Sequence, residues 1–193
     1  MTLHGEVPPA GLLLAAGEGS RLGRPKALVE LGGERLVDRG VRVLREAGCS
    51  PVVVVTGAAE LEVMGAVVVT NPGWRTGMGS SLRIGLGELP PTCPAVVVTL
   101  VDQPRITTAA VRRLIEAYDG GAQVAVATYG GKPRNPVLFV RAHFSAVAET
   151  AEGDVGARPF LRSHADLVTP VPCEDVAAPD DIDTPEDLAA FSD

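Results

Sequence analysis

Short apolar runs alternate along this chain with segments in which apolar residues recur every three or four positions. A continuous apolar run of about four to eight residues between glycines or prolines is typical of a buried strand, whereas the longer repeat is typical of an amphipathic helix. The runs predict strands at 11–16, 51–55, 66–70, 95–101, 124–128, 136–140 and 167–171. The repeats predict helices at 36–47, 82–89, 107–118, 142–150, 158–164 and 185–191.

The order of these elements predicts the fold class. Strands and helices alternate through almost the whole chain, which favours an α/β fold with a largely parallel sheet. The chain has 193 residues, 46% of them hydrophobic and 21% charged, and this balance is enough for one core without disulfides or a structural metal. No shift in composition divides the chain, so residues 1–193 are expected to form a single domain.

Charge is unevenly distributed along the chain, and this limits the kinds of partner that the protein can be expected to bind. The net charge is −7, but the segment from Glu174 to the end holds eight acids and no Lys or Arg. A protein without a basic field binds nucleic-acid backbones poorly, so DNA and RNA are not expected partners. A local group of acids, in contrast, is suited to a hard divalent cation.

Other features exclude further classes of protein. No stretch approaches the ~20 apolar residues of a membrane helix. Residues 1–9 contain an acid in place of the basic start of a secretory signal, so a cytoplasmic protein without a membrane partner is expected. Cys49, Cys93 and Cys173 are widely spaced, which argues against a zinc knuckle or a disulfide framework.

The most informative segment is the glycine-rich sequence LAAGEGSRLGRPK at 14–26, which follows the first predicted strand. Glycines let the backbone approach an anion closely and expose its N–H groups. Arg21 adds a fork of donors for phosphate oxygens, and Lys26 adds a compact positive charge. Open α/β sheets bind ligands at the carboxyl ends of their strands, so this loop is a candidate phosphate site. The candidate nucleotide-binding residues here are Leu14, Ala15, Ala16, Gly17, Gly19 and Ser20.

Two well-known phosphate-binding motifs and a simple turn each fit this loop less well. A Walker P-loop requires Lys-Ser or Lys-Thr after its last glycine, but Arg24 follows Gly23. A dinucleotide-binding G-x-G-x-x-G fingerprint would place its third glycine one residue before Gly23, and it leaves Arg21 and Lys26 unexplained. A purely structural turn does not account for the two spaced cations.

The pattern L-A-A-G-x-G-x-R-x-G-x-x-K resembles the signature of GT-A-type nucleotidyltransferases, and within them it is most similar to the MobA-like molybdenum-cofactor group. Segments 71–82, 101–104 and 181–188 match the same group in the same order along the chain. The resemblance implies a Rossmann-like three-layer sandwich with a mostly parallel, mixed sheet.

The resemblance also implies a metal site. Asp102 ends the fourth predicted strand, where a lone aspartate is often only a turn residue, but its Asp-Gln-Pro context matches the family. Mg²⁺ (or Mn²⁺) prefers oxygen ligands, with one or two carboxylates completed by substrate phosphates. The expected ligands are therefore Asp102 and Asp183, with Asp181 as an alternate for Asp183. Arg21, Lys26 and Asp102 are the expected catalytic residues.

Two further loops are expected to bind the substrates. In the resembled family the loop at 77–81, before the predicted helix at 82–89, contacts the base and ribose. Its expected contacts are Gly79, Ser80 and Ser81, and the alternative for either serine is a simple helix cap. Residues 153–158 match a loop on the acceptor side. Asn135 stands where the family commonly has a histidine, so the role of that histidine is not carried over to it. The candidate acceptor-binding residues are Asn135, Asp154, Gly156 and Arg158.

The resemblance implies transfer of a nucleoside monophosphate from a nucleoside triphosphate to a phosphorylated acceptor of the molybdopterin type, with release of pyrophosphate. CTP is favoured over GTP because Ala16 stands where guanylyl-transferring members usually carry glycine. A sugar phosphate is the alternative acceptor, and a molybdoenzyme is a candidate partner for delivery of the product. A different class of function, a non-catalytic protein that binds nucleotide or pterin, is opposed by the retained charges of Arg21, Lys26, Asp102 and Asp183.

Overall fold

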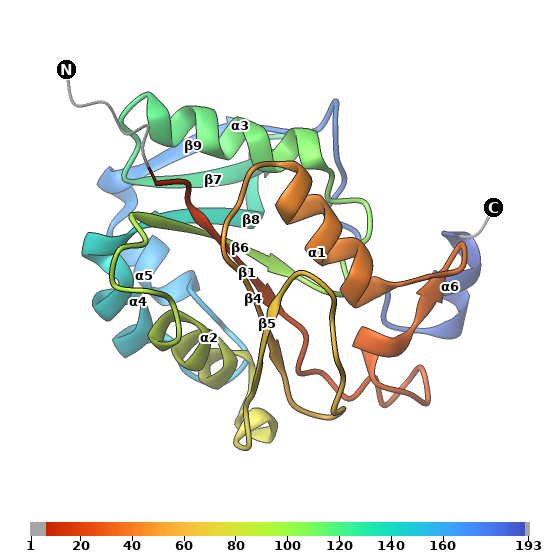
Figure 1. Cartoon of the computed structure of the whole chain (residues 1–193). Coiled ribbons are helices and arrows are strands. Elements are labelled where there is room, and N and C mark those ends of the chain that lie inside the picture. Colours follow the sequence, from red (N-terminus) through yellow and green to blue (C-terminus); the bar gives the residue numbers. More distant parts are fainter. Residues whose placement is uncertain (1–6, 192–193) are drawn as a thin grey trace.

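A seven-stranded sheet forms the centre of the protein in the computed structural model, which describes residues 7–191 (Figure 1). The strands lie side by side in the order β5 (Val67–Thr70), β4 (Val52–Thr56), β1 (Ala10–Leu14), β6 (Ala95–Leu100), β8 (Lys132–Val140), β7 (Val124–Tyr129) and β9 (Val168–Pro172). The first four are mutually parallel, β8 runs antiparallel to both of its neighbours, and β9 is parallel to β7. The predicted mostly parallel, mixed sheet is confirmed.

Helices cover both faces of the sheet. One face carries α1 (Leu36–Glu46) and α3 (Thr108–Asp119), and the other carries α2 (Met78–Gly87), α4 (Phe144–Thr150) and α5 (Arg158–Ser163) (Figure 1). Successive side chains of a strand point to opposite faces, so β1 packs Leu13 with α1 and α3, and Leu12 and Leu14 with α2 and α4. Such a strand is apolar at every position, which explains its continuous run in the sequence. The predicted three-layer sandwich is confirmed.

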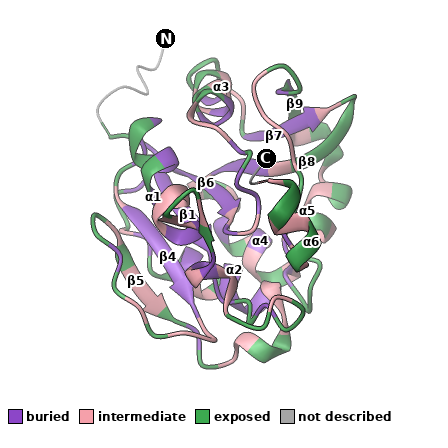
Figure 2. Ribbon diagram, turned by 90° about the vertical axis from the view of Figure 1, so that its right-hand side faces the viewer, coloured by how far each residue is buried: buried purple, intermediate pink, exposed green. Residues whose placement is uncertain are grey.

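Burial falls from the centre of the sheet to its β5 edge. All five residues of β4 are buried, whereas none of the four residues of β5 is fully buried and Val67 is 54% exposed (Figure 2). No helix in the described part of the chain is both long and apolar enough to cross a membrane.

Three features of the elements differ from the sequence prediction. A two-stranded hairpin, β2 (Glu30–Leu31) and β3 (Glu34–Arg35), was not predicted because two residues are too few to show a repeat. β8 starts at Lys132, four residues before the predicted strand, because its first part is exposed and polar. α2 starts at Met78, four residues before the predicted helix, because the three residues after Met78 are small and show no apolar repeat. The short closing helix is α6 (Pro185–Ala190), and single turns of 3₁₀ helix lie at Lys26–Leu28, Trp74–Thr76, Arg141–His143 and Ala165–Leu167.

The strand order determines where a ligand can bind. β1 lies between β4 and β6. After β1 the chain forms β4 and β5 on one side of this strand, and it later forms β6 on the other side. The connections that follow β1 and β6 therefore diverge at the carboxyl ends of these two strands, and open α/β sheets bind their ligands at such a point. The glycine-rich loop follows β1, and Asp102 follows β6.

Candidate functional site

The glycine-rich loop is folded back on itself at the end of β1. The backbone N–H of Lys26 donates to the carbonyl of Gly17 at 3.3 Å, which closes the loop. Gly19 has a φ of 60°, and a Cβ at this position would lie 2.2 Å from the carbonyl oxygen of Arg24. Only glycine fits there, so this part of the motif has a steric reason in the loop itself.

Backbone hydrogen bonds bring two distant segments to the start of the loop. The N–H of Val101 donates to the carbonyl of Leu14 at 3.1 Å, so Asp102 follows directly beside the end of β1. The carbonyl of Asp102 accepts a 2.8 Å hydrogen bond from the N–H of Ile182, and the Ile182 side chain is fully buried. The segment around Ile182 is thereby anchored beside the end of β6, and Asp183 follows it.

These segments place one lysine between two aspartates. The Nζ of Lys26 lies 2.6 Å from Oδ2 of Asp102 and 2.5 Å from Oδ1 of Asp183. The Lys26 and Asp102 side chains are 15% and 20% exposed, and that of Asp183 is 37% exposed. Arg21 is more open, at 68%, and its Nη2 lies 3.4 Å from the second oxygen of Asp183. All four residues named from the sequence pattern therefore meet at one edge of the sheet.

The electrostatics of this group favour a charged lysine. Burial lowers the pKa of Lys26, but its charge interactions and hydrogen bonds with Asp102 and Asp183 outweigh burial, and its pKa is raised above the ordinary lysine value. Lys26 is therefore an ammonium ion at neutral pH. It supplies a fixed positive charge at the carboxyl ends of β1 and β6, where its low exposure weakens screening by solvent.

Asp181 has a different environment from Asp183. Its Oδ1 accepts a 2.7 Å hydrogen bond from Nε2 of Gln103, a residue that is buried directly after Asp102. Burial raises the pKa of Asp181, and the hydrogen bond from Gln103 opposes this rise. Lys26 is paired with Asp183, and Asp181 with Gln103. The geometry therefore favours Asp183 over Asp181 as the second carboxylate beside Asp102.

The donor set fits a divalent metal that is completed by a substrate. Asp102 and Asp183 direct one oxygen each at the same cation, and both are hard ligands of the kind that Mg²⁺ and Mn²⁺ prefer. Within residues 7–191 no group of three His, Cys, Asp or Glu side chains could hold a metal by itself. Two carboxylates without a third protein ligand match a metal that obtains its other oxygens from phosphates and water.

The serines of the expected base loop are turned into the protein. Ser80 and Ser81 are buried in the first turn of α2, and their hydroxyl oxygens accept hydrogen bonds of 2.8 and 3.0 Å from Nδ2 of Asn71. Ser80 also donates to the carbonyl of Gly77. Neither serine caps the helix by its side chain. The hydroxyls face Asn71 because α2 begins before these residues. Contact of Gly79, Ser80 and Ser81 with a nucleotide stays a prediction.

The expected acceptor loop lies against the start of α2. The carbonyl of Gly153 accepts a 2.8 Å hydrogen bond from the N–H of Gly79, and Oδ1 of Asp154 accepts one of 3.3 Å from the N–H of Met78. The fit is too close for side chains, since a Cβ on Gly79 would lie 2.7 Å from the backbone of Ala151. The two loops that the sequence assigned to different substrates are thus in direct contact.

The remaining acceptor candidates lie on separate elements. Gly156 has a φ of 55°, and Arg158 is the first residue of α5. The carbonyl of Asn135, on β8, accepts a 3.2 Å hydrogen bond from the hydroxyl of Tyr129. Within the described part of the chain, no hydrogen bond or ion pair joins Asn135 or Arg158 to Lys26 and its two aspartates.

Comparison with known proteins agrees with this geometry. Residues 11–168 match the family described as the MobA-like NTP transferase domain, which covers most of the chain. The chain belongs to this family of nucleotidyltransferases. The match includes the glycine-rich loop and Asp102, and it ends before Asp183.

Its relatives differ in the activities for which they are named. The chain is 37% identical to nicotine blue oxidoreductase of Paenarthrobacter nicotinovorans, over 92% of this chain and 93% of that protein. A shorter stretch of 51 residues, 26% of this chain and 25% of the relative, is 57% identical to a probable molybdenum cofactor guanylyltransferase of Opitutus terrae.

Among solved structures, Rv0371c from Mycobacterium tuberculosis H37Rv superposes with a TM-score of 0.83 at 27% identity, covering 96% of this chain and 97% of that one. A structure of the same protein in complex with manganese gives a TM-score of 0.79 at 25% identity, covering 96% and 98%.

Gly57, beside this MobA-like site, was not found by sequence reasoning. A Cβ on Gly57 would lie 2.5 Å from Cβ of Trp74 and 2.9 Å from Cβ of Ala16, so these residues pack closely on one side of the glycine-rich loop. Trp74 is half-buried, and the guanidinium carbon of Arg75 lies 4.4 Å from the centroid of its ring. Gly57 follows β4 in a short turn and carries no signal in the sequence.

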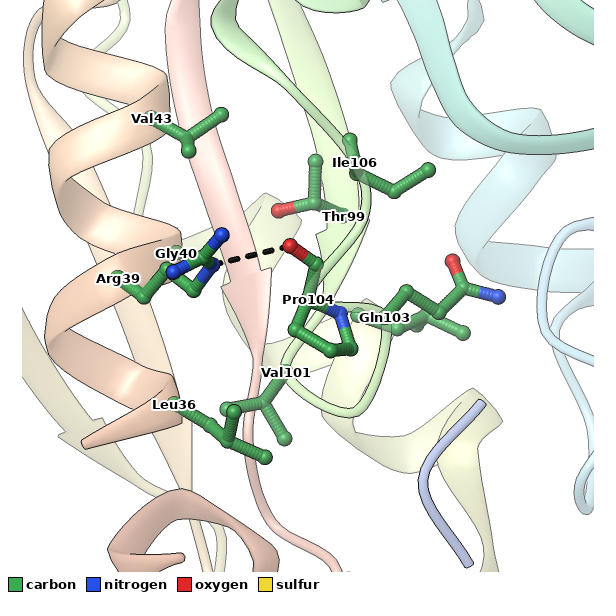
Figure 3. Close-up of a pocket in the computed structure, with 10 residues that line it drawn as sticks. Leu36, Arg39, Gly40, Val43, Thr99, Val101, Gln103, Pro104 and Ile106 are labelled. Atoms are coloured by element: carbon green, nitrogen blue, oxygen red, sulfur yellow. Dashed lines mark hydrogen bonds between the residues drawn. The ribbon is translucent and has the colours of Figure 1, made fainter. Parts of the chain in front are cut away.

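Arg39 was missed for a different reason. It lies on α1 beside a cavity of about 20 Å³, and its Nε donates to the carbonyl of Pro104 at 2.9 Å (Figure 3). The amide of Gln103 points away from this cavity (Figure 3), and its Nε2 donates to Oδ1 of Asp181. Arg39 therefore holds the turn after Asp102 to α1. Its partner is a backbone carbonyl, which no pattern of side chains could indicate.

Proposed function

We propose that the protein transfers a nucleoside monophosphate from a nucleoside triphosphate, CTP in preference to GTP, to the terminal phosphate of a molybdopterin-type acceptor. The observation that carries the proposal is the position of Lys26 between Asp102 and Asp183 at the carboxyl ends of β1 and β6. A partly buried ammonium, an exposed guanidinium and two carboxylates at a glycine-rich loop suit a triphosphate bound together with a metal. A sugar phosphate is the alternative acceptor, and delivery of the product to a molybdoenzyme remains part of the proposal.

In this mechanism the loop amides and Arg21 bind the β- and γ-phosphates, and Lys26 neutralises negative charge that develops on the α-phosphate. Asp102 and Asp183 would hold Mg²⁺ or Mn²⁺, which would supply charge neutralisation to the phosphate oxygens. A phosphate oxygen of the acceptor forms a bond with the α-phosphorus. The bond from the α-phosphorus to its bridging oxygen breaks, and pyrophosphate leaves with that electron pair. The acceptor phosphate is already anionic, so positioning and charge stabilisation suffice without a strong general base.

The test is pyrophosphate release with purified protein, Mg²⁺, molybdopterin, and CTP, GTP, ATP or UTP in separate reactions. We expect CTP to give the fastest release and Mg²⁺ removal by a chelator to stop it. Omission of molybdopterin should also stop release, because no acceptor is then present. Absence of acceptor-dependent pyrophosphate release with all four nucleotides would contradict the proposal.

A redox activity is a second candidate, because the relative that is 37% identical over 92% of this chain is named an oxidoreductase. The charges of the site favour phosphate transfer, since hydride transfer has no evident use for a lysine between two aspartates. Mixing the protein with nicotine blue and either NADH or NADPH, and following the dye absorbance, separates the two candidates. Dye reduction without any acceptor-dependent pyrophosphate release would favour the oxidoreductase.

A further inference from the structure

Lys26 lies where a metal held by the two aspartates would have to be. Its Nζ is 2.6 Å from one carboxylate oxygen of Asp102 and 2.5 Å from one of Asp183. A Mg²⁺ ion held by the same two oxygens would lie about 2.0–2.1 Å from each, in nearly the same place. The ammonium and the metal therefore exclude each other from this position.

We propose that Lys26 is a built-in substitute for the metal, which leaves the two aspartates only when a nucleotide phosphate offers it a new partner. Metal and nucleotide then enter the site together, and the nucleotide-free protein binds divalent metal weakly. The inference rests on the proposed function and adds an order of events to it.

The side chain of Lys26 is placed for such an exchange. A Cβ on Gly19 would lie 3.3 Å from Cγ of Lys26, and one on Gly17 would lie 4.0 Å from its Cδ. The aliphatic part of Lys26 thus runs along the glycine-rich loop that is proposed to hold the phosphates. Lysine carries its charge on a flexible four-carbon chain, so rotation about its terminal bonds can move Nζ from the aspartates toward a phosphate above the loop.

Charge balance explains why the exchange needs the nucleotide. Without it, the cations Lys26 and Arg21 pair with the anions Asp102 and Asp183, while the nearby Asp181 is hydrogen-bonded to Gln103. Metal binding alone would take both carboxylates from the Lys26 ammonium, which has only 15% of its side chain exposed and would then need a new anionic partner. A triphosphate supplies that partner, and the two carboxylates are then free to bind the metal.

The test measures binding of Mn²⁺ by calorimetry to the whole protein without nucleotide, in the wild type and in Lys26→Met. We expect the variant to bind Mn²⁺ at least about tenfold more tightly, because one neighbouring opposite charge changes the affinity of a carboxylate by roughly that factor or more. Arg24→Met is the matched control: it removes one exposed cation of the same loop, which forms no ion pair with Asp102 or Asp183 in the described part of the chain. Its Mn²⁺ affinity should stay within about twofold of the wild type.

The same titration in the presence of a CTP analogue with a methylene group between the α- and β-phosphorus tests the coupling. Mn²⁺ affinity of the wild type should rise with the analogue, and that of Lys26→Met should rise less. Lys26→Gln gives a second measurement if the methionine variant does not fold. Equal or weaker Mn²⁺ binding by both Lys26 variants without nucleotide would overturn the exchange and leave the transferase proposal standing. No Mn²⁺ binding by any protein, even with the analogue, would overturn the metal part of both.

Discussion

The two halves of the candidate site are built in different ways. Around Lys26 the contacts are between charged side chains, with distances of 2.5 and 2.6 Å to two aspartates from distant parts of the chain. At the start of α2 the contacts are between backbone groups, with Gly79 against the 151–154 segment and no room for a Cβ. The first region depends on charge and the second on volume. A substitution that changes charge but keeps volume should therefore be damaging in the first region, and one that adds volume without charge should be damaging in the second.

The largest effect is expected from a change of charge without a change of shape. Asp102→Asn keeps the size of the side chain but removes its negative charge, so the ion pair with Lys26 and the proposed anionic metal ligand are both lost. Under the proposed mechanism, kcat should fall by ~10²–10³, as for other single groups that stabilise transition-state charge. Pyrophosphate release measures the loss, and circular dichroism checks the fold. Near-normal turnover would show that Asp102 does not belong to the catalytic group.

A change of volume should act most strongly in the second region. Gly79→Ala would place a Cβ 2.7 Å from the backbone of Ala151, and the two segments must separate. We expect a loss of stability of about 1–3 kcal/mol, measured by urea unfolding, together with a higher KM for the nucleotide. Gly87→Ala is the matched control, because it lies in the same helix and its Cβ would meet no atom within 4 Å. The control should be neutral or slightly stabilising. Equal stabilities of the two variants would show that close contact at Gly79 is unimportant.

The smallest effect is expected where a backbone contact supports the charged region. Asp187 accepts hydrogen bonds of 3.0 Å from the N–H of Asp183 and 2.8 Å from that of Thr184, and Thr184 caps α6 in return. Hydrogen bonds from Asp183, and then from Thr184, lower the pKa of Asp187 in the folded protein. A lowered pKa means that its stabilising contribution is present above the unfolded-state pKa of about 4 and is lost as the pH falls through the folded-state value.

Asp187→Asn should therefore lower Tm by about 1–3 °C at pH 7, and the difference from the wild type should shrink as the pH falls below about 4. Thermal unfolding followed at several pH values measures both parts. A difference that grows toward low pH would contradict the assigned sign. A matched change at Glu186, the neighbouring acid of the first helical turn, should lower Tm less at pH 7 because the capping box uses Asp187.

The sequence alone located most of the elements of this protein and named the candidate groups for its chemistry. Strands buried on both faces must be apolar at every position, so β1, β4 and β6 could be located from continuous runs, and the three-layer sandwich was confirmed. Lys26 and Asp102 could be named because their residue types and their place after predicted strands suit phosphate and metal. Their roles stay predictions, because no bound substrate or metal tests them.

Only the tertiary structure decided which side chains are partners. It placed Lys26 between residues 76 and 157 positions away, assigned Asp183 to Lys26 and Asp181 to Gln103, and turned Ser80 and Ser81 toward Asn71. The physical reason is that periodic patterns report the local backbone and the buried face. The choice between two carboxylates two residues apart depends on how separate segments pack, and that information is spread over the whole core.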